Sequence, residues 1–227
     1  MIERNMTDSE ILAEIKKVED TIVSRIGGYT KKYQKAIKNK AYKHNDVLGV
    51  NDYVINGNNV ICCFQKVIHT EKLADLTIAN IIVTDWGAYI PMYNEYNRLS
   101  YVFLSKHSID RMWQRMGLTL KEFFVNEYCV KSQTAHHLVK YDGYGYDDDT
   151  YVFNYGNCFF IAVADENKIV AKTCLDRDNI YTNQMMMYVE SKRGGESFSN
   201  KIADKNCKKI LDAGIKKTND YLMRYCA

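Results

Sequence analysis

The chain opens with apolar residues at helical spacing. Thr7 is followed three positions later by Glu10, which is typical of a capping box, and apolar side chains then recur every three or four residues. Gly27 and Gly28 interrupt this pattern, and glycine is favoured just beyond the end of a helix. The spacing predicts a helix that begins after Thr7 and is closed by the two glycines. A second, basic helix is expected over residues 29–43.

The pattern then changes to the short apolar runs of β-strands. Residues 53–55 and 60–67 flank Asn56 and Gly57, a pair that favours a tight hairpin turn. Further strands are expected at residues 74–83 and 99–104.

After Ser105 the helical period returns. Apolar side chains recur on one side as far as Met116, and Gly117 is expected to end this short helix. Thr119 is placed to cap a further helix over residues 120–128. Strand-like runs separated by turn sequences then predict an antiparallel meander, followed by helices. The runs cover residues 135–141, 150–155, 158–164 and 169–175, and the helices cover residues 179–192 and 198–225.

We therefore predict an α+β fold with a central antiparallel sheet, a short helix that bears His and Arg residues, and flanking N- and C-terminal helices. The chain has 227 residues and one proline, Pro91, which argues against a Pro-rich linker between distant domains. We expect residues 1–227 to form a single compact unit. It would comprise a helical N-terminal arm at 1–45, a β-rich extension at 46–98, a core at 99–175 and C-terminal helices at 176–227.

The seven cysteines show no C-x-x-C pair and no even spacing, so we interpret them as buried free thiols of a reducing compartment. Cys62 and Cys63 would face opposite sides of an extended strand. No apolar run approaches the roughly 18 residues that span a bilayer, and the first residues lack the order of a signal peptide. We expect a soluble cytoplasmic protein without a membrane partner.

The net charge of +3 is unevenly distributed. Residues 29–43 contain six lysines, three tyrosines and no acid, whereas residues 141–166 contain six acids and no Lys or Arg. Residues 192–217 carry eight basic residues against three acids. Such polarity suits contact with a nucleic acid or an acidic protein partner, although solvated helix faces would show the same runs.

Candidate chemistry lies in residues 103–118. His107, Arg111 and Arg115 are spaced by four, so a helix would place them in one polar stripe. An imidazole can donate or accept a proton near neutral pH, and guanidinium groups can bind a phosphate through two hydrogen bonds. The alternative is structural: His107 would be held by backbone groups, and the arginines would pair with Asp110, Glu122 or residues 147–149.

The segment Ser105-Lys-His107-Ser-Ile-Asp-Arg111-Met-Trp-Gln-Arg115-Met-Gly resembles a family of small bacterial and phage domains of unknown function. The family pattern is Phe-Ser-x-His-Ala-x-x-Arg-Met-x-x-Arg-Gly-Ile, and its members are grouped with RelE-type and barnase/EndoU-like ribonuclease toxins. The resemblance covers about residues 99–175. This chain departs from the pattern at Ser108 and at Met116.

The resemblance implies a metal-independent endoribonuclease of toxin type, in which a ribose 2′-hydroxyl attacks the adjacent phosphate. His107 would be the general acid or base, Arg111 and Arg115 would stabilise the phosphate, and Lys172 on the last strand would add a cation. Accessory contacts to the RNA are expected from lysines that bind phosphates and tyrosines that stack on bases. These residues are Lys31, Lys32, Lys35, Lys38, Tyr151 and Tyr155.

Two other hypotheses compete with a ribonuclease. The protein would be a non-enzymatic phage or mobile-element protein that binds and inhibits a host protein, or a nucleic-acid-binding module without catalysis. The partner is accordingly RNA, or a host or antitoxin protein. Convergence of His107, Arg111, Arg115 and Lys172 in one accessible concave site would favour the enzyme, and dispersed positions would favour the interaction protein.

A metal site is not predicted, although His136 and His137 precede three acids at residues 147–149. Adjacent residues on a strand point to opposite faces, so both imidazoles cannot readily bind one ion. The sequence also lacks the Gly-rich motifs of phosphate-binding loops. We therefore expect no metal and no cofactor.

Overall fold

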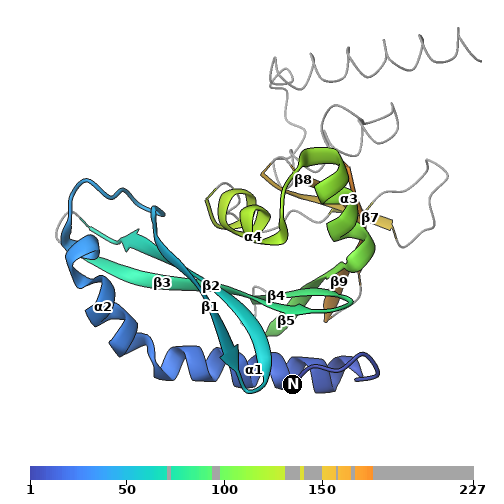
Figure 1. Ribbon diagram of the computed structural model, residues 1–227, viewed down its shortest axis with the longest axis horizontal. Helices are drawn as coiled ribbons and strands as arrows, with labels where there is room; N and C mark the ends of the chain where they lie inside the picture. Colours follow the sequence, from blue (N-terminus) through green and yellow to red (C-terminus); the bar gives the residue numbers. More distant parts are fainter. Residues whose placement is uncertain are drawn as a thin grey trace, which may run out of the picture.

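The computed structural model describes residues 1–70, 73–93, 98–130, 139–140, 150–156, 158–164 and 167–175. Their main feature is a nine-stranded sheet with the order β1-β2-β3-β4-β5-β9-β8-β7-β6, with helices on both of its faces (Figure 1). The predicted α+β fold class is confirmed. The helices predicted within residues 176–227 lie outside the described residues.

Every neighbouring pair of strands is antiparallel except β5 and β9, which run parallel with Tyr101 opposite Lys168. The chain leaves the sheet after β5 and returns beside it at β9, which gives a crossover connection and a parallel pair. The strands are β1 (Val47–Ile55), β2 (Asn58–Ile68), β3 (Ala74–Thr84), β4 (Gly87–Tyr93), β5 (Leu99–Ser105), β6 (Val139–Lys140), β7 (Thr150–Tyr155), β8 (Cys158–Ala164) and β9 (Lys168–Leu175).

The hairpin of β1 and β2 turns at Asn56 and Gly57, as predicted. Both residues have positive φ angles, 51° and 79°, which Asn and Gly adopt most readily. Strand β4 was not predicted, and it contains Pro91, which cannot donate a backbone hydrogen bond. Pairing with β3 ends at Tyr89, so the missing donor interrupts no β3 hydrogen bond.

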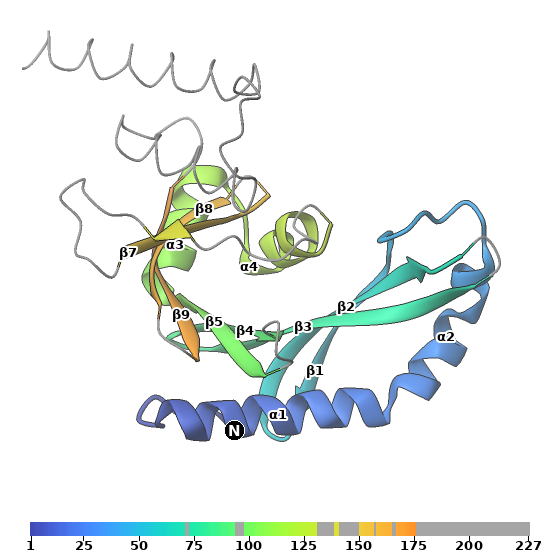
Figure 2. The same cartoon turned by 180° about the vertical axis from the view of Figure 1, so that it is seen from behind.

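Helices α1 (Asp8–Ser24) and α2 (Ile26–Lys38) lie along one face of the sheet (Figure 2). The capping box of Thr7 and Glu10 is present. The predicted break at the two glycines is wrong, because α1 ends at Arg25 and both glycines lie within the first turn of α2. Neither glycine has a positive φ angle, so the left-handed conformation by which glycine ends a helix does not form there.

The opposite face of the sheet carries α3 (Lys106–Met116), α4 (Leu120–Glu122) and a π-helix, η1 (Phe123–Val130). Ser105 caps α3, and Gly117 ends it in the left-handed conformation, as the sequence predicts. Thr119 caps α4 through a capping box. The change to π-helical geometry at residue 123 was not predicted.

Two hydrophobic cores lie on the two faces of the sheet. Ile15 and Val18 of α1 pack against one face, and Met112 of α3 packs against the other. Cys62 belongs to the first core and Cys63 to the second, which confirms their predicted opposite orientation. All five cysteines within the described residues are free and buried. Among the described helices, none has the length and apolar character needed to cross a bilayer.

Candidate functional site

The first turn of α3 is fixed to the sheet by hydrogen bonds. The hydroxyls of Ser105 and Ser108 each lie 3.0 Å from the carbonyl oxygen of Ala171 on β9. The backbone N–H of Lys106 donates to the carbonyl of Trp86, in the turn between β3 and β4, at 2.9 Å. These contacts set the position from which the exposed side chains of Lys106 and His107 project.

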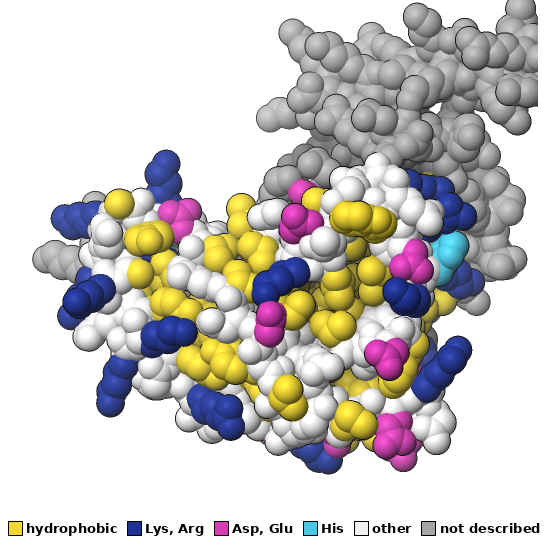
Figure 3. Space-filling view, in the orientation of Figure 1, with side chains coloured by type: hydrophobic (Ala, Val, Ile, Leu, Met, Phe, Trp, Pro, Cys, Tyr) yellow, Lys and Arg dark blue, Asp and Glu magenta, His cyan; other side chains and the backbone are white. Residues whose placement is uncertain are grey.

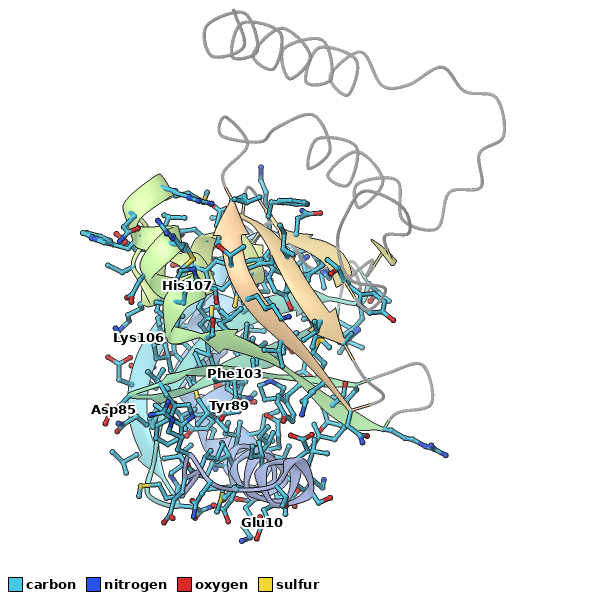
Figure 4. All side chains as sticks on the ribbon, turned by 90° about the vertical axis from the view of Figure 1, so that its right-hand side faces the viewer. Glu10, Asp85, Tyr89, Phe103, Lys106 and His107 are labelled. Carbon is cyan, nitrogen blue, oxygen red and sulfur yellow. The ribbon has the colours of Figure 1, made fainter. Side chains whose placement is uncertain are left out.

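An open pocket of about 490 Å³ lies between the start of α3, strand β5 and the start of α1. Figure 4 shows Lys106 and His107 at the start of α3, above Phe103 and Tyr89 on the sheet. Asp85 lies below Lys106 in this view, and Glu10 lies on α1 at the bottom. The volume is typical of small-molecule sites. The pocket is lined by basic side chains and by aromatic rings, namely Arg4, Lys106, His107, Lys168, Trp86, Tyr89, Tyr101 and Phe103.

The aromatic rings form a fixed wall. The ring of Tyr89 lies 4.8 Å from that of Phe103 and 5.5 Å from that of Tyr101, measured between centroids. The Trp86 indole N–H donates to the Tyr89 hydroxyl at 3.1 Å. Tyr89 and Tyr101 are buried, whereas Trp86 and Phe103 are half-buried. Burial raises the pKa of Tyr89, against the opposing effect of the Trp86 hydrogen bond, so its hydroxyl stays neutral.

The glycine at position 87 is required by this wall. A Cβ atom there would lie 2.5 Å from a ring carbon of Phe103 and 2.4 Å from the carbonyl oxygen of Leu104. Only glycine allows the Phe103 ring to lie directly against the β4 backbone. The position of the Phe103 ring is therefore fixed by the close approach of the paired strands β4 and β5.

The acidic side chain that lines the pocket, Asp8, is paired with a lysine. Asp8, the first residue of α1, forms an ion pair with Lys168 and accepts a hydrogen bond from the Tyr101 hydroxyl at 2.8 Å. Burial opposes ionisation of Asp8, but the hydrogen bonds from Lys168 and Tyr101 and the charge of Lys168 outweigh it and lower its pKa. Asp8 and Lys168 together add no net charge to the pocket.

The other basic side chains of the pocket have no ion-pair partner among the described residues or have only a weak one. Within the described part of the chain, the side chains of Arg4 and His107 make no hydrogen bond or ion pair. The Lys106 ammonium lies 3.3 Å from the carboxylate of Asp110, and both side chains are at least half exposed, so this pair is weak. Arg4 and Lys106 therefore leave the lining of the pocket with a net formal positive charge.

The predicted site residues are only partly brought together. His107 lines the pocket, but Arg111, Arg115 and Lys172 do not. The Arg111 guanidinium donates to the Gln114 side chain at 3.1 Å, and that of Arg115 donates to the Cys174 carbonyl at 2.7 Å. Neither arginine forms the alternative pairs with Asp110 or Glu122, and the third alternative, at residues 147–149, lies outside the described residues.

Lys172 is exposed on β9, at a bulge where the register between β8 and β9 shifts. The residues opposite the shift are Ile161 and Ala162 on β8, which pair with Thr173 and Ala171. Lys172 is thus the extra residue of the bulge. Lys172 follows Ala171, whose carbonyl accepts the hydrogen bonds from the start of α3, and it does not line the pocket.

The predicted lysines of α2 form a separate surface. The helix packs on the sheet through Tyr29, Tyr33 and Ile37 and exposes its lysines to solvent (Figure 3). Figure 1 shows α2 on the left of the molecule, beside β3, and α3 on the right, beside β9. Helix α1, of 17 residues, separates the pocket from α2 by about 26 Å at 1.5 Å per residue. The exposed lysines are Lys31, Lys32, Lys35 and Lys38.

The two predicted tyrosines differ in accessibility. Tyr155 is fully buried among Phe123, Phe153 and Phe160, so it is not available to stack on a base. Burial also raises its pKa well above the ordinary value. Tyr151 is half-buried on β7.

No group of three or more His, Cys, Asp or Glu residues among those described is arranged to hold a metal ion. His136, His137 and the acids at residues 147–149 lie outside the described residues.

Sequence reasoning missed most of the pocket. Phe103 and Lys106 lie in the same segment as His107 and were within reach of that motif, but they were given no role. Nothing in the sequence connects Arg4, Trp86 or Lys168 with it, because these residues come from separate segments.

No protein-family model matches the chain, and comparison with curated proteins and with solved structures found no significant similarity. The resemblance to ribonuclease toxins therefore stays a prediction.

Proposed function

We propose that this protein binds RNA, and that Arg4, Lys106 and His107 are its main phosphate contacts. The observation that carries the proposal is the convergence of these three side chains on the rim of one pocket. A guanidinium binds a phosphate through two hydrogen bonds, and an ammonium binds it as a point charge. RNA is favoured over DNA by the resemblance of residues 105–117 to ribonuclease toxins.

The lysines of α2 provide a second contact area. All four are exposed, and residues 29–43 contain no acid to compete with a phosphate. Clustered lysines bind the nucleic-acid backbone without reading its sequence. A strand held at the pocket would gain further affinity if it also reached α2.

Binding is better supported than cleavage. Transesterification needs one group to remove the 2′ proton, another to protonate the leaving oxygen, and cations at the phosphorane. Three of the four residues predicted for these roles, Arg111, Arg115 and Lys172, lie outside the pocket lining. Tyr89 is buried with a raised pKa, so it is poorly suited to proton transfer.

Cleavage is kept as the second candidate function because of His107. It is exposed on the pocket rim next to Lys106, and the described residues leave its imidazole without a hydrogen-bond partner. Incubation of the binding reaction in EDTA, beside a His107→Ala variant, separates the two functions. RNA that is cut by the parent protein and not by the variant would establish a ribonuclease.

The test of RNA binding is the salt dependence of affinity for a short labelled single-stranded RNA. We expect Arg4→Gln and Lys106→Gln each to weaken binding and to reduce the slope of log affinity against log salt by about 1, because each phosphate contact releases a counterion. Lys16→Gln is the control, since Lys16 lies on α1, pairs with Asp20 and does not line the pocket.

If the double variant at Arg4 and Lys106 behaves like Lys16→Gln, the pocket is not the phosphate site. If the parent protein binds no RNA at all, the hypothesis of a protein that inhibits a host protein takes precedence. Binding of DNA of the same sequence with equal affinity would remove the preference for RNA.

A further inference from the structure

The pocket presents aromatic surface as well as charge. Trp86 and Phe103 are half-buried, and both line the pocket together with the buried rings of Tyr89 and Tyr101. Ring surface of this kind is not needed to bind a phosphate. Each nucleobase has a flat face, and stacking on an aromatic side chain contributes about 1–3 kcal/mol per base.

The two accessible rings are held in place before any ligand binds. Trp86 is fixed by its hydrogen bond to the Tyr89 hydroxyl, at 3.1 Å, and by its carbonyl, which accepts from the first N–H of α3. Phe103 is fixed by the Tyr89 ring, 4.8 Å away, and by the backbone at Gly87. A planar ligand would therefore enter without ordering these side chains, which reduces the entropic cost of binding.

The charged groups lie on the rim of the same pocket. Arg4 comes from the segment before α1, and Lys106 and His107 come from the start of α3. Asp8 adds no repulsion toward an anion, because it is paired with Lys168. The pocket thus offers an apolar ring surface and a positive rim within about 490 Å³.

We infer that the pocket accepts one unpaired nucleotide, with its base against Trp86 and Phe103 and its phosphate at Arg4, Lys106 and His107. This inference rests on the proposed function and deepens it, because it names the state of the RNA. A base paired in a duplex cannot leave its stack without a cost of a few kcal/mol. The protein should therefore prefer single strands, loops or ends to a duplex.

The chain offers a direct optical test. It contains two tryptophans, Trp86 and Trp113. Trp113 is 57% exposed on α3 and lines a different hollow with Ile109 and Leu118, so Trp113→Phe leaves Trp86 as the single tryptophan with little effect on the pocket. Excitation at the red edge of the tryptophan band, where tyrosine does not absorb, then reports on Trp86 alone. AMP should quench this fluorescence to saturation, and inorganic phosphate should compete with it.

The second measurement uses a Phe103→Leu variant, which keeps an apolar side chain but loses the flat ring. We expect it to lose about fivefold or more of the preference for single-stranded RNA over a duplex of the same sequence. The salt slope should stay unchanged, because no phosphate contact is removed. Trp113→Leu is the matched control, and urea unfolding verifies that each variant is folded.

The outcomes distinguish the two proposals. Absence of AMP quenching in Trp113→Phe, or an unchanged single-strand preference in folded Phe103→Leu, overturns the inference of a base in the pocket. RNA binding whose salt slope still depends on Arg4 would leave the proposed function standing in that case. The quenching experiment needs no substitution in the pocket, so it remains decisive even if Phe103→Leu fails to fold.

Discussion

Helix α2 and the pocket at the start of α3 both carry positive charge, but they present it differently. Helix α2 exposes four lysines from one short segment, on a surface that faces solvent. The pocket also has four basic groups, but they come from the N-terminal segment, α3 and β9, and lie around aromatic rings. A run of like charge in the sequence therefore indicates a surface that binds polyanions without selectivity. A concave pocket, by contrast, is assembled from segments that are distant in the sequence.

The largest effect is expected at Glu14, which holds the segment that carries Arg4. Its carboxylate pairs with the N-terminal amine at 2.6 Å and with Lys17 at 2.5 Å. The hydrogen bonds from Lys17 and from the N-terminal amine lower its pKa to about 2. We expect Glu14→Gln to reduce the free energy of unfolding at pH 7, because it removes the charge that both partners pair with. The loss should be about 1–2 kcal/mol and no larger, because solvent screens the two exposed partners.

The pH dependence of this effect has a definite sign. The pKa of Glu14 is lower in the folded state than its ordinary value of 4.5, so the stabilisation is present above pH 4.5 and is lost as the pH falls toward about 2. Urea unfolding of both proteins should show a difference that shrinks over this range. Glu3→Gln, at an exposed position of the same segment, is the control.

The same variant separates the two surfaces. If Glu14 positions the N-terminal segment, its loss should weaken the Arg4-dependent part of RNA binding and spare the α2 part. Equal stability of Glu14→Gln and Glu3→Gln at pH 7 would show that the ion pairs do not hold this segment.

A smaller effect is expected when the lysines of α2 are removed. Replacing all four with Gln should reduce the salt slope for single-stranded RNA by up to about 3 and lower the affinity roughly tenfold. The preference for single strands over a duplex should persist, because clustered lysines bind phosphates without reading the bases. A preference lost together with the slope would show that α2, and not the pocket, senses unpaired RNA. The substituted residues are Lys31, Lys32, Lys35 and Lys38.

The sequence predicts the local features of this fold better than it predicts contacts between residues that are distant in the sequence. The caps at Thr7 and Thr119 and the turn at Asn56 depend on side chains within a few residues, and all three are confirmed. By contrast, Asp8 and Lys168 pair across 160 positions, because β9 inserts beside β5. Periodicity alone does not reveal such an insertion.

Part of the candidate site was predictable for the same reason. Of the residues predicted for catalysis, only His107 lines the pocket, and Lys106 is its neighbour in the same motif although the sequence assigns it no role. The sequence does not predict the burial of Tyr155, because its strand shows no alternation of polar and apolar positions that would identify the buried face. Its burial depends on η1, which packs Phe123 against its ring.

The smallest effects are expected on the arginine stripe of α3. Arg115→Gln should lower the free energy of unfolding by about 1 kcal/mol, because its guanidinium donates to the Cys174 carbonyl and links α3 to β9. Arg111→Gln should change it by less than about 0.5 kcal/mol, since its hydrogen bond to Gln114 stays within the helix. Neither variant should affect the salt slope for RNA more than Lys16→Gln does. A loss as large as that of Arg4→Gln would move the phosphate path from the pocket to the His107, Arg111 and Arg115 stripe, where the sequence spacing alone places it.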